Sequence, residues 1–220
     1  MSASAYERTR GKPYAETFRC PGGALCVDFC NSGQGIRGPR RDEWIAGYGE
    51  LVDWLDAAEA IPHAQAARLL RSGVTAPQAA TAAWKRAITL REALFRVFSA
   101  AAEQSVASRE DLELIETEFE TCVASSQLDW SDTHYVWRLN QEASTPRVVI
   151  YPIVRSAIDL LTSETLSRVR QCAGATCSWL FLDETKNRSR RWCEMASCGN
   201  LAKVRRHRER GVEPRRTPKR

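Results

Sequence analysis

The sequence predicts a mainly α-helical protein: a helical array with a small β-hairpin, followed by a C-terminal treble-clef or zinc-ribbon-like module. Three observations lead to this fold class. Between residues 42 and 170, long stretches repeat apolar residues every three or four positions, as amphipathic helices do. Near residues 135–151 the runs become short, aromatic and β-branched, which is typical of strands. Two close cysteine pairs lie between residues 172 and 198, in a segment too small to build a core of its own.

The first expected elements are short. Residues 1–19 are polar and predict a flexible N-terminus. In residues 25–31 apolar and polar side chains alternate, but a run of this length fits a short strand as well as the first turn of a helix. After a glycine-rich loop, Asp42 is expected to be the N-cap of a helix. A second short helix is expected at 63–72, after Pro62.

The centre of the array is predicted to be one long helix. It starts at Pro77, which suits a first helical position, and ends at about Glu103. Two apolar stripes run along it, so neighbours are expected on both sides. A further helix is expected from Ser108 to about Ser125, because the residues that follow Ser108 resemble a capping box.

The last part of the body predicts a hairpin and a helix. Residues 135–139 and 147–151 are the expected strands, with a polar turn between them. Pro152 is expected to start a helix over residues 153–170 that runs directly into the first cysteine pair. The helical domain predicted in this way covers residues 20–170.

The cysteine pairs predict a metal site. Cys172 and Cys177 form the first pair, and Cys193 and Cys198 form the second, fifteen residues later. Such spacing is typical of a tetrahedral zinc site with four thiolate ligands, in which one Zn²⁺ ion is structural and leaves no position open for a substrate. Four buried thiols or two disulfides are the alternative interpretations. The chain starts without the apolar stretch of a secretory signal, which favours a cytoplasmic location and metal binding over disulfides.

Positive charge is concentrated around these cysteines. Residues 168–220 hold 15 Lys and Arg against 5 Asp and Glu, whereas residues 1–167 hold 17 against 22. This asymmetry is typical of a protein with a nucleic-acid-binding end. A short strand at 178–183, a cationic turn at 184–191 and a helix at 201–210 are the elements expected there.

The cationic turn and the helix supply the candidate nucleic-acid contacts. Lysine and arginine suit phosphate oxygens, and arginine also suits guanine edges in the major groove. The candidates are Lys186, Arg188, Arg190, Arg191, Lys203, Arg205, Arg206 and Arg210. The basic residues 211–220 have nothing to bury and predict a disordered tail.

Several residues of this segment also match a known motif. They are Trp179, Phe181, Asp183, the run Lys186-Asn-Arg-Ser-Arg-Arg-Trp-Cys193 and the run Cys198-Gly-Asn200. In these residues the segment resembles the CGNR zinc-finger family. The resemblance implies that residues 171–210 form a finger that binds DNA in bacterial regulators. Leu201 stands where the family motif has arginine, so either one DNA contact is missing or Leu201 packs against the fold.

The helical body carries a second resemblance. Residues 25–31, 90–94 and 156–161 are similar to ABATE, the domain that accompanies CGNR fingers and is described as a stress-induced transcription regulator. Together with the finger, the resemblance spans residues 22–210. It implies a bacterial regulator that acts in a stress response.

Two further groups of residues are candidates for sites. Asp28 and Asn31, beside the glycine-rich loop, and Arg91, within the helical array, could line a pocket for a small-molecule effector. The alternative is that the first two satisfy backbone groups and that Arg91 pairs locally. The cysteines at positions 20, 26 and 30 have no fourth ligand near them in sequence, so packing is expected there and not a second metal or redox site.

These observations predict a zinc-dependent, DNA-binding transcription regulator whose helical domain senses a ligand, dimerises, or both. A single small DNA-binding module buries roughly 600–1,000 Å², so a homodimer is expected. An RNA-binding module is one alternative, with Trp179, Phe181 or Trp192 stacked on bases, although at least two of these aromatics are expected to pack against the cysteines instead. A protein-interaction zinc module is the other.

Two classes of protein are not expected. The sequence offers no nucleophile–base set, phosphate loop or serine elbow, which argues against an enzyme. It also has no run of eighteen apolar residues, which argues against a membrane protein.

Overall fold

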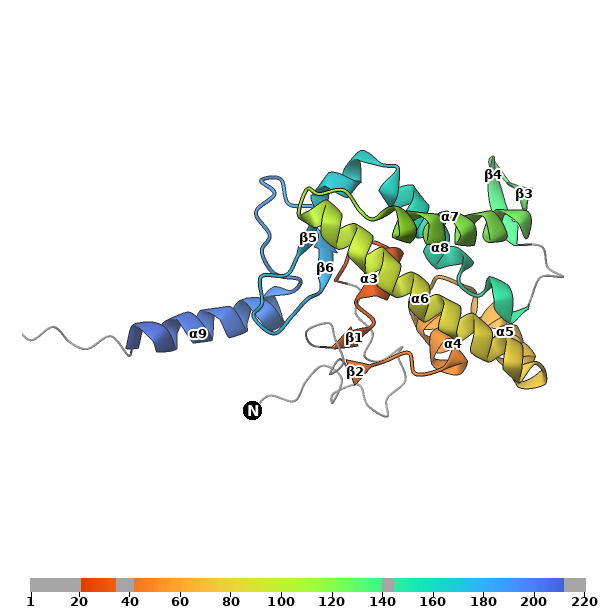
Figure 1. Ribbon diagram of the computed structural model, residues 1–220, viewed down its shortest axis with the longest axis horizontal. Helices are drawn as coiled ribbons and strands as arrows, with labels where there is room; N and C mark the ends of the chain where they lie inside the picture. Colours follow the sequence, from red (N-terminus) through yellow and green to blue (C-terminus); the bar gives the residue numbers. More distant parts are fainter. Residues whose placement is uncertain (1–20, 35–41, 140–144, 212–220) are drawn as a thin grey trace, which may run out of the picture.

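The computed structural model describes residues 21–34, 42–139 and 145–211. Helix α6 (Pro77–Ala102) runs through the middle of the array and contacts α3 (Leu25–Cys30), α4 (Tyr48–Ala57), α5 (His63–Thr75) and α7 (Arg109–Ala124) (Figure 1). It buries residues on two sides, as a central helix must. The predicted fold class is confirmed, and so are the predicted positions of α5, α6 and α7.

Residues 25–31, whose period fitted either a strand or a helix, form α3. Its side chains from Cys26 to Cys30 are all buried. Packing explains why these residues form a helix and not a strand. Helix α3 lies between α6 and α8 (Tyr151–Leu161), so it buries side chains on all of its faces.

The predicted N-cap at Asp42 is wrong. Residues Asp42–Glu43 form strand β2, paired with β1 (Gly33–Gln34), and α4 begins at Tyr48 with Gly47 as its N-cap. The Glu43 carboxylate accepts a hydrogen bond from the Ile45 backbone N–H (2.9 Å) and another from Arg91 (2.8 Å). These contacts fix Glu43 at the end of β2 and the residue after the bend at Trp44, and the helix begins only at Tyr48.

The predicted cap of α7 is confirmed. Ser108 is the N-cap, and its hydroxyl accepts a hydrogen bond from the Asp111 backbone N–H. Asp111 is buried, and Arg96 on α6 donates to both of its carboxylate oxygens. These bonds from Arg96 lower the pKa of Asp111 more than burial raises it, and Ser108 lowers it further.

The lowered pKa of Asp111 predicts a pH-dependent contact between α6 and α7. A carboxyl whose pKa is lower in the folded state stabilises the protein above its unfolded pKa of about 3.9, and this contribution is lost as pH falls through the folded value. Urea unfolding should therefore show a destabilisation by Asp111→Asn that is largest above about pH 5 and shrinks below pH 4. Asp159→Asn, which removes an exposed ion pair with Arg155, is the control and should cost little at any pH. A constant gap between wild type and Asp111→Asn would contradict the prediction.

The predicted hairpin is displaced along the chain. Residues 135–139 do form a strand, β4 (His134–Leu139), but its partner is β3 (Ser126–Ser131), which precedes it. A two-residue turn joins them, with Asp132 in the left-handed region at φ 48°. The predicted second strand, 147–151, is instead a 3₁₀ turn, η2 (Pro146–Val148), that leads into α8, and Val148, Val149 and Ile150 are buried in the core.

The last helix of the body is shorter than predicted. Helix α8 ends at Leu161, the 3₁₀ helix η3 (Glu164–Arg168) follows, and strand β5 (Val169–Gln171) leads into Cys172. The hydroxyls of Thr162 and Ser163 donate back to carbonyls of the last turn of α8 and so cap its end.

Strand β6 (Leu180–Leu182) pairs with β5 in antiparallel register, with Val169 opposite Leu182 and Gln171 opposite Leu180. Successive side chains of β6 point to opposite faces of the hairpin. Leu180 and Leu182 join the main core, whereas Phe181 packs in a separate cluster with Cys172 and Cys193. This hairpin therefore connects the helical body to the cysteine-rich segment.

Within the described ranges, no helix combines the length and the apolar composition that crossing a bilayer requires.

Candidate metal centre

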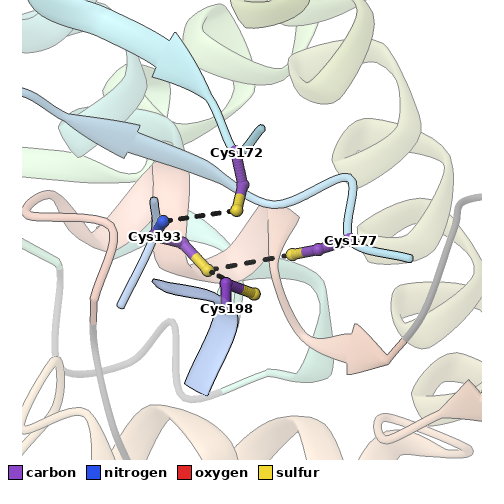
Figure 2. Close-up of side chains that lie close together, drawn as sticks. All are labelled: Cys172, Cys177, Cys193 and Cys198. Atoms are coloured by element: carbon purple, nitrogen blue, oxygen red, sulfur yellow. Dashed lines mark hydrogen bonds between the residues drawn. The ribbon is translucent and has the colours of Figure 1, made fainter. Parts of the chain in front are cut away.

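The four predicted cysteine ligands converge on one point (Figure 2). The Cys193 sulfur lies 3.7 Å from that of Cys177 and 3.6 Å from that of Cys198, and all four sulfurs lie within 4.8 Å of one another. Zn–S bonds of about 2.3 Å in a tetrahedron place sulfurs ~3.8 Å apart, so the observed separations fit one Zn²⁺ ion. A disulfide requires about 2.05 Å between its sulfurs, and all four cysteines are free.

Each cysteine is held by a different local structure. Cys172 directly follows β5, and Cys177 closes a tight turn in which its N–H donates to Gly174 O. Cys193 follows the cationic turn, and Cys198 lies in the π-helical turn η4 (Met195–Gly199), which leads into α9 (Asn200–Gly211). The β5–β6 hairpin thus carries the first pair at its tip, and the strand expected at 178–183 is β6, paired with the residues that precede the first pair.

The pKa values of these thiols are shifted in opposite directions by their mutual contacts, an arrangement that suits the binding of a cation. Hydrogen bonds from Cys177 and the other neighbouring thiols lower the pKa of Cys172. The side-chain hydrogen bond with Cys172 raises the pKa of Cys177 and of Cys193, because a thiol that donates to a neighbouring sulfur keeps its own proton. A divalent ion removes this difference between the thiols, since a coordinating thiol loses its proton. The Cys193 backbone N–H donates to the Cys172 sulfur (3.4 Å), a second contact that favours thiolate.

Gly174 leaves space for the sulfurs. A Cβ at this position would lie 3.1 Å from the Cys177 Cβ and 3.4 Å from the sulfurs of Cys172 and Cys198. We expect Gly174→Val to push the ligands apart and to speed zinc release to a chelator by at least about tenfold. Gly49→Ala, where a Cβ meets nothing within 4 Å, is the matched control and should release zinc at the wild-type rate. Equal release from all three proteins would show that Gly174 does not shape the site.

Asp183 organises the cationic turn that leads to Cys193. Its carboxylate accepts hydrogen bonds from the backbone N–H (3.0 Å) and the hydroxyl (2.5 Å) of Thr185 and from the Arg190 N–H (2.9 Å). Burial raises the pKa of Asp183, but these hydrogen bonds outweigh it and lower the pKa overall. Asp183 was named above only as a residue of the CGNR motif, although an Asp two residues before a Thr is a signal of such a side-chain turn.

Arg190 has a structural role that replaces the predicted nucleic-acid contact. Its guanidinium donates to the backbone carbonyls of Pro21, Leu182, Trp192 and Cys193 and lies 4.4 Å from the centre of the Phe181 ring. Four of its five N–H groups are therefore used within the protein. Arg190 braces the zinc segment and is not directed towards a ligand.

Most of the other predicted cations have exposed side chains. The side chains of Lys186, Arg188 and Arg191 are exposed on the turn, and those of Lys203, Arg205 and Arg206 are exposed on α9. The Arg210 side chain lies outside the described part of the chain. Helix α9 extends away from the helical body (Figure 1). Leu201 is 63% exposed, so it does not replace the motif arginine by packing.

The proposed effector-pocket residues have partners within the protein. Asp28 accepts from the Gly22 N–H (2.8 Å), and Asn31 forms two hydrogen bonds with the backbone of Leu180. The buried Arg91 pairs with Glu43 at 2.6 Å and with Glu92 at 3.0 Å. These contacts are those of the alternative interpretation, in which Asp28 and Asn31 satisfy backbone groups and Arg91 pairs locally, and they join segments of the fold to one another.

Trp179 adds to the joint between the finger and the body. Its indole N–H donates to Gly33 O (2.8 Å), and its ring meets the Trp44 ring edge-on at 5.8 Å. Trp179 and Trp192 are half-buried against the cysteines, and Phe181 is fully buried there, which confirms the expected packing of these aromatics.

The remaining described cysteines do not assemble into a second site. Cys26, Cys30 and Cys122 are buried, and burial raises the pKa of Cys26 and of Cys122 to about 12. They pack as apolar side chains. Cys20 lies outside the described residues. Gly174 is a further residue of the site that the sequence did not single out, because the crowding around it arises only when the four cysteines converge.

Comparison with known proteins agrees with this geometry. Residues 23–164 match ABATE, described as "Putative stress-induced transcription regulator", and residues 168–211 match the CGNR zinc finger. No curated protein matches the chain. The four clustered cysteines lie within the CGNR match and are its zinc site. The chain belongs to the ABATE family and carries a CGNR zinc finger after its helical domain.

Proposed function

We propose that this protein is a transcription regulator that binds duplex DNA through its zinc finger. The observation that carries the proposal is the helix that follows the fourth zinc ligand. Lys203, Arg205 and Arg206 are exposed on α9. This helix extends away from the helical body (Figure 1). An exposed helix of about 12 residues is of a size that a major groove accepts, and the fourth zinc ligand, Cys198, lies in the turn η4 that leads directly into this helix.

The aromatic side chains favour DNA over single-stranded RNA. Recognition of unpaired bases relies on exposed aromatic faces on which bases stack. Phe181 is buried, and the Trp179 indole is tied to Gly33 and packed on Trp44. The cations exposed on the turn and on α9 instead suit a phosphate backbone.

In this proposal the helical body regulates the zinc finger. Asn31 and Gly22, at the two ends of α3, both bond to β6 of the finger. A small-molecule effector that displaced α3 would displace the finger with it. The proposal places this regulator in the bacterial cytoplasm, in a stress response and as a homodimer, and it assigns no catalysis to the closed zinc site.

Charge reversal on α9 tests the proposal. We expect Lys203→Glu/Arg206→Glu to weaken binding to duplex DNA at least about tenfold at 0.15 M salt and to flatten the dependence of affinity on salt, because both cations are removed from the phosphate contacts. Arg68→Glu/Arg71→Glu, on exposed positions of α5, changes the net charge equally and serves as the control.

Electrophoretic mobility shift with genomic fragments, in competition with single-stranded RNA, is the measurement. DNA affinity that Lys203→Glu/Arg206→Glu leaves unchanged, or a preference of the wild type for RNA, would remove the DNA assignment.

A further inference from the structure

The β3–β4 hairpin exposes an apolar face. Leu128 lies opposite Trp137 and Trp130 lies opposite Tyr135, so all four side chains share one side of the sheet. They are 54%, 42%, 60% and 66% exposed, respectively. Trp130 and Tyr135 pack edge-on with their ring centres 5.0 Å apart. We call these four residues the aromatic hairpin face.

This face is large enough to be a binding surface. Aromatic side chains bury about 150–250 Å² each, so the exposed parts of the four side chains present roughly 500 Å² of contiguous apolar area. Patches of this size on soluble proteins often mark interaction sites. A two-stranded hairpin is also marginally stable in water by itself and gains from a partner that covers it.

The charges around the aromatic hairpin face argue against a polyanionic partner. Residues 126–139 hold one Lys or Arg, Arg138, and two acidic residues, Asp129 and Asp132. Arg138 lies 3.8 Å from Asp129, on the opposite side of the hairpin. Nucleic acids and anionic membranes are bound by clusters of cations, so an apolar protein surface fits better.

We propose that the aromatic hairpin face packs against the same face of a second copy of the chain. Two such faces are self-complementary, as a two-fold dimer requires, and together they bury about 1,000 Å², the lower limit for a specific interface. The dimer is accordingly weak, with a dissociation constant on the order of micromolar. The hairpin lies at the opposite end of the molecule from α9, so both fingers stay accessible in the dimer (Figure 1).

This inference deepens the proposed function, because it names the surface through which the regulator dimerises. It does not require DNA. The two hypotheses are separable, since Lys203→Glu/Arg206→Glu should lose DNA affinity and still dimerise.

Sedimentation velocity of the zinc-loaded full chain tests the dimer. Wild type should shift from monomer to dimer as its concentration rises through the micromolar range, to about 100 µM. Trp130→Thr/Trp137→Thr keeps strand propensity and removes both tryptophan rings from the face, and it should sediment as a monomer throughout. Val136→Thr, on the other side of the same hairpin, is the control and should dimerise as wild type does.

Trp130→Arg is a second variant, which changes a single exposed side chain and should separate the copies by placing cations near each other. Wild type that stays monomeric up to about 100 µM overturns the proposal. So does a dimer that persists in both tryptophan variants, because the interface then lies elsewhere. Unaltered helical circular dichroism and zinc content establish that the variants are folded.

Discussion

Replacing Cys193 with serine is expected to abolish zinc binding and to unfold the finger. Cys193 is central in the cluster: its sulfur lies within 3.7 Å of those of Cys177 and Cys198, and its N–H bonds to Cys172. Structural zinc contributes about 10–16 kcal/mol of folding free energy in zinc-finger peptides. The small cluster around Phe181 offers no comparable hydrophobic stabilisation.

Zinc content and amide hydrogen exchange measure this outcome. Wild type should hold one zinc ion per chain, and Cys193→Ser should hold less than about 0.1. Exchange protection should be lost from the turn before Cys193 to α9 and kept in α6, whose core residues do not touch the site. Cys122→Ser, a buried cysteine on α7, is the control and should retain its zinc. A full complement of zinc in Cys193→Ser, or a wild type without zinc, would disprove the four-thiolate site.

Replacing Asn31 with alanine is expected to loosen the finger from the body. The Asn31 side chain donates to Leu180 O (2.8 Å) and accepts from Leu180 N–H (2.9 Å), so it pairs with β6 as a neighbouring strand would. Both residues are buried. Each buried backbone group left without a partner costs about 1–3 kcal/mol, so Asn31→Ala, which leaves two such groups on Leu180, should lower the free energy of unfolding by about 2–6 kcal/mol.

Chemical denaturation of the zinc-loaded protein measures the loss, with Asn187→Ala as control, because Asn187 is exposed on the cationic turn. Hydrogen exchange at β6 distinguishes the mechanism, since Asn31→Ala should raise it there more than at α4. A cost below about 0.5 kcal/mol, the size of an ordinary surface substitution, would mean that Asn31 does not hold the joint.

The elements that the sequence predicted correctly are those defined by local chemistry. Proline at the start of α6 and the Ser108 cap of α7 are signals contained in a few neighbouring residues, and the structure uses both. The zinc ligands belong to the same group. A zinc site requires particular ligand residues at particular spacings, and both are visible in the sequence.

The errors arose where distant residues decide the local conformation. Glu43 is extended because Arg91, which is 48 residues away, binds its carboxylate. Residues 148–150 have the composition of a strand, but they pack in the core as the entry to α8. In the same way, the charge of Arg190 predicted a contact with nucleic acid. Its guanidinium instead donates to backbone carbonyls that lie far apart in the chain, among them those of Pro21 and Cys193.

The sequence alone therefore determined the helical class of the body, the four thiolates that bind one zinc ion and the concentration of positive charge around them. These are properties of residue type, period and spacing. Tertiary structure decided which cations are exposed, how the finger is joined to α3 and where the aromatic hairpin face lies. The physical reason is that each of these depends on whether a side chain finds a partner far away in the chain, and a buried polar group must find one.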